Sequence, residues 1–203
     1  MMNSFEPNGT LVHAHSEATL PNHSDFEFHK FYVVSIQKFW ILFMASFGLY
    51  ALYWFYKHWY EIKLFQKSDI WPIPRAIFQV FFTHSLFKEI SSTLKNKQIS
   101  FKWALPPSLL ATIYVVVSIV SNAADRFSRH NDDFSAIDAV SLIFLPVLGW
   151  CLAQAQKAAN LAVGDAQGAS NATMTAANYV WLVFFGLMWL VIFWSLYVVF
   201  ISS

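Results

Sequence analysis

Long apolar runs alternate with short polar segments along this chain. Four runs stand out, near residues 39–56, 103–122, 139–160 and 179–201. An α-helix rises about 1.5 Å per residue, so a run as long as 39–56 spans about 27 Å, close to the hydrocarbon thickness of a bilayer. The pattern therefore predicts an all-α, polytopic membrane bundle with about four transmembrane helices.

Aromatic residues crowd the end of the first run. Tyr and Trp side chains favour the headgroup level of a membrane, where the ring stays apolar and its OH or NH stays hydrated. We therefore expect an interfacial anchor, the aromatic collar, which consists of Tyr50, Tyr53, Trp54, Tyr56 and Trp59.

Residues 73–90 have a different pattern, in which apolar positions are interrupted by polar ones. Pro72 and Pro74 suit the first turn of a helix. The segment predicts an amphipathic helix lying in the membrane interface, followed by a basic loop over 91–98. Its polar face consists of Arg75, Gln79, His84 and Lys88. A segment that inserts or crosses instead is the alternative, and crossing would raise the number of spans to five.

Composition supports a membrane protein with one domain. Apolar residues make up 57% of the chain and charged residues 12%, against about 45–50% and 25% in soluble domains. We expect a single membrane domain over 31–203, preceded by a disordered polar tail over 1–30. The net charge of +1 gives no reason to expect a nucleic-acid partner, whereas the lipid bilayer is the expected one.

Basic residues predict the orientation. Eight Lys and Arg lie between Lys57 and Lys102, against three acidic residues. Cytoplasmic loops carry such an excess, so four spans would place both termini and the 125–138 loop outside. Lys30 and Lys38 flank the first run on the other side and weaken this rule. With five spans, the amino terminus would be inside.

The motifs of common catalytic and metal sites are missing from the sequence. It has no glycine-rich phosphate loop, paired-cysteine frame, His-Glu-x-x-His helix or Gly-x-Ser-x-Gly elbow. No charged residue lies midway in any of the four runs, which argues against an ion-coupled transporter. We therefore predict a protein that is not an enzyme and has no catalytic, cofactor-binding or metal-binding residues.

A polar cluster follows the third run. Small residues four apart, such as Gly149 and Ala153, predict close helix packing there. The cluster consists of Gln156, Lys157, Asn160, Asp165 and Asn171. It has two interpretations: helix-end polarity with hydrogen bonds between helices, or a polar mouth that holds a ligand or a partner.

Several short motifs follow one another from roughly residue 31 to the final run. They are Gly48-Leu-Tyr50-Ala-Leu-Tyr53-Trp54-Phe55-Tyr56 with Trp59, Arg75-Ala-Ile-Phe78, Ser85-Leu-Phe87-Lys88, Gln156-Lys157-Ala-Ala-Asn160, Gly164-Asp165, Asn171 and Ala176-Ala-Asn178-Tyr-Val-Trp181. In this order, the motifs resemble those of uncharacterised bacterial inner-membrane proteins grouped under a domain of unknown function. This resemblance implies a multi-pass protein of the bacterial cytoplasmic membrane and supplies no activity or catalytic residue.

Two functions fit these patterns. The first is a non-enzymatic membrane protein that acts by association with itself, with lipid or with a larger membrane complex. The second is a small-molecule permease or channel subunit, which would need a water-lined path near Gln156, Asn160 and Asp165.

Overall fold

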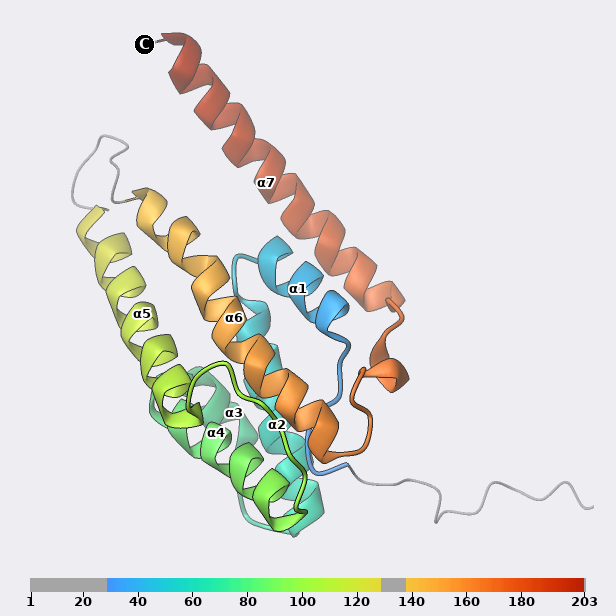
Figure 1. The fold of residues 1–203 in the computed structure, drawn as a ribbon. Helices are drawn as coiled ribbons and strands as arrows, with labels where there is room; N and C mark the ends of the chain where they lie inside the picture. Colours follow the sequence, from blue (N-terminus) through green and yellow to red (C-terminus); the bar gives the residue numbers. More distant parts are fainter. Residues whose placement is uncertain (1–28, 129–137, 203) are drawn as a thin grey trace, which may run out of the picture.

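The computed structural model describes residues 29–128 and 138–202, and this part of the chain is helical without any strand (Figure 1). The predicted all-α class is therefore confirmed. The predicted tail over 1–30 lies almost entirely outside the described residues, as does most of the 125–138 loop. The elements are α1 (Ile36–Ala45), α2 (Tyr50–Gln66), α3 (Pro72–Ile77), α4 (Gln79–Asn96), α5 (Pro107–Ser128), α6 (Asp138–Ala162), the 3-10 helix η1 (Ala169–Asn171) and α7 (Ala176–Ser202).

The expected continuous helix over 39–56 is wrong, because the chain turns after α1. Phe47 and Gly48 have positive φ angles of 53° and 81°, a conformation that glycine adopts freely. The Ser46 hydroxyl accepts a hydrogen bond from the Tyr50 amide (2.9 Å), which gives the first amide of α2 a partner. Ten residues make α1 about 15 Å long, half of a bilayer core. In Figure 1, α1 leads up to this turn and α2 leads back down from it, so the two helices form a helical hairpin.

The expected helix over 73–90 is present in two pieces and extends further than predicted. It divides at Phe78, between α3 and α4, and α4 continues to Asn96, so most of the expected basic loop over 91–98 is helical. The first piece begins where proline is tolerated, with Pro72 in the first turn of α3. The inner face of α4 repeats every three or four residues and buries Thr83, Leu86, Phe87, Ile90, Thr93 and Leu94.

Two helices are long and apolar enough to cross a membrane, as judged by length and composition over the described residues. They are Pro107–Ala124 in α5, with a mean hydropathy of 1.6, and Ala176–Ser195 in α7, with a mean hydropathy of 2.0. The first begins at Pro107 instead of Trp103, because the chain before the proline is not helical. These criteria therefore support two membrane-spanning helices, fewer than the predicted number of about four.

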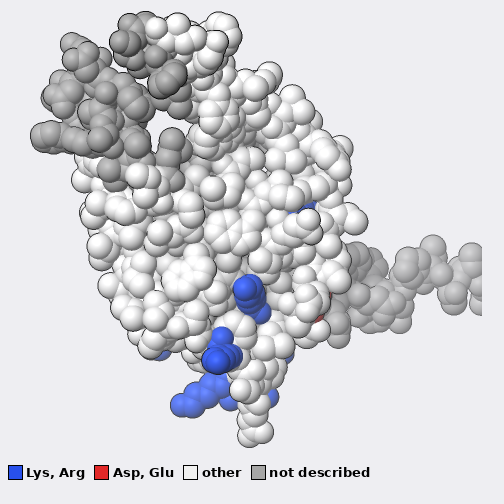
Figure 2. Space-filling model, turned by 45° about the horizontal axis from the view of Figure 1, so that its top comes forward, with Lys and Arg blue, Asp and Glu red and all other residues white. Residues whose placement is uncertain are grey.

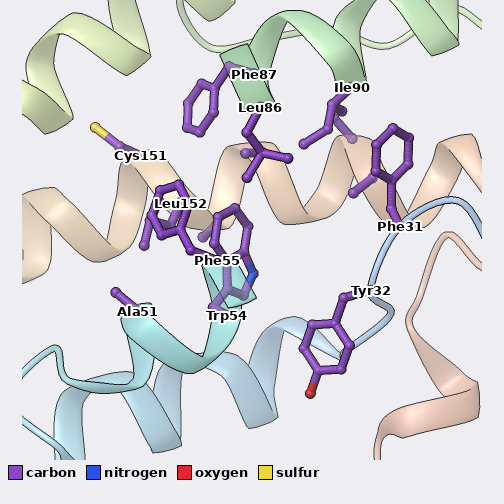
Figure 3. Packing of buried hydrophobic residues seen from close by; sticks show 14 of the residues in the cluster. Phe31, Tyr32, Ala51, Trp54, Phe55, Leu86, Phe87, Ile90, Cys151 and Leu152 are labelled. Carbon is purple, nitrogen blue, oxygen red and sulfur yellow. The ribbon is translucent and has the colours of Figure 1, made fainter. Parts of the chain in front are cut away.

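The core forms where α2, α4 and α6 meet the chain that precedes α1. Figure 3 shows Trp54 and Phe55 from α2, Leu86 and Phe87 from α4 and Leu152 from α6 directed toward one another. All five side chains are fully buried. Such packing joins the hairpin to the long helices as one body.

The small residues of α6 serve this packing. Ala153, Ala155, Ala158 and Ala159 are buried. A Cβ atom added at Gly149 would lie 2.5 Å from the Trp40 ring and 2.9 Å from Phe43, so glycine lets α1 approach α6. The small residues of α6 therefore pack closely against other helices of the same chain.

Positive charge gathers toward one end of the face that Figure 2 shows. In Figure 2 the visible Lys and Arg side chains gather toward the lower end, and most of the remaining described surface is uncharged. The lower end in Figure 1 holds the α2–α3 connection and the end of α4.

Candidate functional site

A buried extended segment, Phe31–Val34, forms the centre of the polar cluster. All four of its residues are buried, and no strand of the described chain pairs with it, so its backbone polar groups need other partners. Two side chains of α6 supply them. Gln156 donates to the Tyr32 carbonyl (2.9 Å), and Asn160 donates to the Val34 carbonyl (2.9 Å) and accepts from the Val34 amide (3.4 Å).

Gln156 also connects this segment to α2. Its Oε1 atom accepts from Nε1 of Trp54 and lies 3.2 Å from Nε2 of His58. Its Nε2 atom additionally donates to Oδ1 of Asn160 (2.6 Å). Gln156, Asn160 and His58 are completely buried. The carboxamide of Gln156 is thus the junction of α6, α2 and the extended segment.

His58 is held as a neutral imidazole. Because the oxygen of Gln156 accepts, Nε2 of His58 carries the proton, and Nδ1 is buried with no hydrogen-bond partner in the described chain. Burial lowers the pKa of His58 to about 3. The side chain therefore stays uncharged at neutral pH.

A second group of polar contacts fastens the start of α1. Lys38 is buried, and its ammonium donates to Oδ1 of Asn171 and to the Thr173 carbonyl, both at 2.7 Å. Asn171 in turn donates to the Tyr32 hydroxyl (3.0 Å) and to the Val33 carbonyl (2.8 Å). Burial lowers the pKa of Lys38. The connection between α6 and α7 therefore closes over the extended segment.

Lys157 and Asp165 do not join the other three predicted residues. Lys157 is exposed on another face of α6. Asp165 accepts hydrogen bonds from the amides of Ala169 and Ser170 (2.8 and 2.9 Å) and from the Ser170 hydroxyl (2.8 Å). These bonds, foremost the one from the Ser170 amide, lower the pKa of Asp165. Asp165 therefore stabilises the turn that leads into η1.

The aromatic collar does not form one belt. Trp54 and Trp59 are buried, Tyr50 and Tyr56 are half-buried, and Tyr53 is exposed. The positions that α2 buries are spaced three or four apart, which is the signature of a packed helix face. They are Ala51, Trp54, Phe55, His58, Trp59 and Ile62. This spacing could have identified the two tryptophans as core residues.

The predicted polar face of 73–90 is also divided. The Arg75 guanidinium lies over the rings of Trp59 (4.3 Å) and Phe82 (5.1 Å), and Gln79 accepts from the Tyr114 hydroxyl (3.1 Å). His84 contacts Thr112 of α5 at 3.0 Å, and Lys88 is exposed. Arg75 and Gln79 thus bind protein groups, and the four residues do not present a single surface to headgroups.

The buried cluster has the chemistry of a structural clamp. Its amides bind backbone carbonyls and an indole, and it brings together no nucleophile with a base. Groups of three or more His, Cys, Asp or Glu able to hold a metal do not occur among the described residues. The sequence did not identify Lys38 as part of this polar cluster, because in the sequence it is only the last charged residue before an apolar run.

The sequence matches no family model and no curated protein, and the structure matches no solved structure. The resemblance to bacterial inner-membrane proteins of unknown function therefore stays a prediction.

Proposed function

We propose that this chain is a multi-pass protein of the bacterial cytoplasmic membrane that catalyses no reaction and acts by association with lipid, with a second copy or with a larger membrane complex. The surface of α7 is the observation that carries this proposal.

Helix α7 is apolar on all sides and nearly uncovered. Only 6% of its Ala176–Ser195 window is buried. Val180, Leu190, Val191 and Trp194 are each between 65% and 70% exposed. Soluble proteins rarely expose apolar patches larger than a few hundred Å². This helix therefore needs lipid or another apolar surface around it.

Contacts on one side hold α7 against the hairpin. Trp189 stacks on Phe47 with ring centroids 4.2 Å apart and donates from Nε1 to the Ala45 carbonyl (3.0 Å). The α1–α2 turn is thus fixed beside the middle of α7. If α7 crosses the bilayer, the hairpin enters the same layer from one side.

In this arrangement α5, α6 and α7 cross the membrane and the hairpin does not. Helix α6 packs along α5, and its 25 residues reach about 37 Å. The lysine-rich end, with Lys63, Lys67, Lys95, Lys97 and Lys102, then faces the cytoplasm. Three spans place the start of α1 inside and the end of α7 outside, whereas four spans would place the start of α1 outside.

Association with a partner would use α7, since the small-residue faces of α6 are occupied by packing within the chain.

The second candidate, a permease or channel subunit, needs water at Gln156 and Asn160. Both side chains are buried and hydrogen-bonded, so no observation favours it.

Alkylation of single cysteines tests the arrangement. Cysteines replace Gln37, Ser68, Ser100, Ser128 and Ser170 one at a time in a Cys151→Ser background, and a membrane-impermeant maleimide is applied to intact cells and to inverted vesicles. We expect Ser128→Cys to react from outside and the other four from the cytoplasm. Reaction of Gln37→Cys from outside would support four spans, and reaction of all five from one side would contradict a transmembrane α5.

Association is measured in the same background with Val191→Cys on the exposed face of α7. We expect oxidation in native membranes to cross-link this cysteine to a second copy or to another membrane protein. Gln37→Cys, at the far end of the hairpin, is the control. If only the uncross-linked chain is recovered, α7 has no protein partner at this position and is surrounded by lipid.

A further inference from the structure

The bend where α3 passes into α4 exposes several large apolar side chains. Ile77 is 62% exposed, Phe78 56% and Phe81 78%. Trp71 and Ile73, at the beginning of the same segment, are also exposed. Soluble proteins rarely leave so many large apolar side chains together in water, and such surfaces mark contacts with a membrane or with another protein. The bend therefore needs an apolar partner.

Contacts with α5 fix the level of this bend. Gln79, the first residue of α4, accepts a hydrogen bond from the Tyr114 hydroxyl (3.1 Å), and His84 contacts Thr112 at 3.0 Å. The stretch of α5 that is long and apolar enough to cross a membrane begins at Pro107. Tyr114 lies seven residues further, which is about 10 Å along the helix. If α5 crosses the bilayer, the bend therefore lies about 10 Å past the start of the span.

The charges of α4 give a second measure of the same depth. Residues 76–87 contain no Asp, Glu, Lys or Arg. The next residue, Lys88, is exposed. It lies nine residues after Gln79, which is about 13 Å along α4. The uncharged part of the segment thus ends where the contacts with α5 place the boundary of the hydrocarbon layer.

The segment begins and ends at the same end of the molecule. In Figure 1 the α2–α3 connection and the end of α4 both lie at the lower end. Lys67 and Lys95 occupy these two places. Arg75, on the way to the bend, lies over the rings of Trp59 and Phe82, so aromatic groups of the protein stabilise its charge. The chain thus reaches the level of Tyr114 and returns, instead of crossing to the other end.

The backbone of the bend suits an apolar environment. Phe78 is the only residue between the two helices. Its amide donates to the Pro74 carbonyl (2.9 Å), and its carbonyl accepts from the Phe81 amide (3.0 Å). In a hydrocarbon layer, backbone polar groups must be paired within the protein. The polar groups of Phe78 meet this requirement.

We propose that α3 and the first half of α4 form a re-entrant hairpin in the cytoplasmic leaflet, and that phospholipid acyl chains cover its bend at Phe78. The proposal rests on the membrane placement proposed above, in which α5 crosses and the lysine-rich end faces the cytoplasm. At the depth of the bend, an uncovered side chain is surrounded by acyl chains. Lys67 and Lys95, at the two ends of the segment, suit the anionic headgroups of that leaflet.

Nitroxide spin labels on the full chain test this depth. A single cysteine replaces Phe81 in the Cys151→Ser background, and the labelled chain is reconstituted in vesicles of phosphatidylethanolamine and phosphatidylglycerol. Power saturation compares collisions with oxygen, which concentrates among acyl chains, and with a nickel chelate, which stays in water. We expect the Phe81→Cys label to collide with oxygen and to be shielded from the chelate.

Lys88→Cys is the matched control, because Lys88 lies two turns further on the same exposed face of α4. Its label should collide with the chelate and lie roughly 10 Å nearer the headgroups than the Phe81→Cys label, the rise of seven helical residues. Both native side chains are exposed, so neither cysteine disturbs the core.

Three results would overturn the proposal. Equal access of the chelate to the two labels would place the bend in water. Poor access of both oxygen and the chelate to the Phe81→Cys label would place a second copy of the chain on the bend instead of lipid. Alkylation of Ser68→Cys and Ser100→Cys from opposite sides of the membrane would show that the segment crosses.

A label at Val191→Cys on α7 separates this inference from the proposed function. A lipid signal from Val191→Cys together with a water signal from Phe81→Cys would remove the re-entrant hairpin alone. Access of the chelate to both labels would also remove the membrane placement on which the hairpin rests.

Discussion

At the scale of single residues, Gln156 does the most to hold the chain together. Its one carboxamide contacts Tyr32, Trp54, His58 and Asn160. Buried polar groups are costly when they lose their partners, about 1–3 kcal/mol each. The stability of the clamp thus depends on a side chain that no solvent reaches.

Gln156→Leu should therefore lower the free energy of unfolding by about 3 kcal/mol, since it leaves the Trp54 indole and the Tyr32 carbonyl unpaired. Denaturant unfolding in detergent, followed by tryptophan fluorescence, measures the change. Lys157→Leu is the neighbouring control on an exposed face and should change stability by less than about 0.5 kcal/mol. Similar losses in the two variants would show that the clamp is not what Gln156 contributes.

His58 predicts a pH dependence of stability. Its pKa is about 3 in the folded chain and near 6.5 when unfolded, so the unfolded state takes up the proton first. The stability that His58 contributes is complete above pH 6.5 and is lost as the pH falls toward 3. Between pH 8 and pH 5 the loss should be about 2 kcal/mol.

Unfolding experiments at these two pH values measure this loss, and His58→Gln should remove it while His84→Gln, at an exposed site, should keep it. An unchanged slope in His58→Gln would assign the pH dependence to other groups.

At the scale of elements, the sequence predicted helices well and their ends poorly. Apolar runs define helices because no other regular structure satisfies its backbone along one segment. The break at Ser46–Leu49 was missed because Phe47 and Leu49 continue the apolar run, and one serine and one glycine give little warning. The partners of Gln156 and Asn160 were out of reach because Tyr32 and Val34 lie more than 120 positions away.

The contact between α1 and α6 makes a prediction for Gly149. Gly149→Leu should destabilise the chain by about 2–3 kcal/mol, because the new side chain would overlap the rings of Trp40 and Phe43. Gly186→Leu on α7 is the matched control, since a Cβ there has no neighbour within 4 Å. Detergent unfolding should show it unchanged or slightly stabilised, as helix propensity favours leucine over glycine. Equal destabilisation of both variants would contradict a close approach at Gly149.

At the scale of the whole molecule, the hairpin bears on the number of membrane crossings. Four apolar runs suggested four crossings, but α1 is too short and reverses direction at its end. Of the predicted polar cluster, Gln156 and Asn160 lie one turn apart in α6, and both bond the segment before α1; Asn171, in η1, bonds the same segment. The sequence left two roles open for this cluster, and the hydrogen bonds of Gln156 and Asn160 run to groups of the same chain. The Lys and Arg side chains seen in Figure 2 gather toward the lower end, where Figure 1 shows the α2–α3 connection and the end of α4.

The extended segment that α6 clamps has a consequence for biosynthesis. Val34 leaves the ribosome 126 residues before Asn160, its partner. At about 5–20 residues per second, the segment waits roughly 6–25 s for the side chains that will hold it. The amino-terminal part of the domain is made first and locked last, so a nascent chain that stops after α5 has no means of seating it.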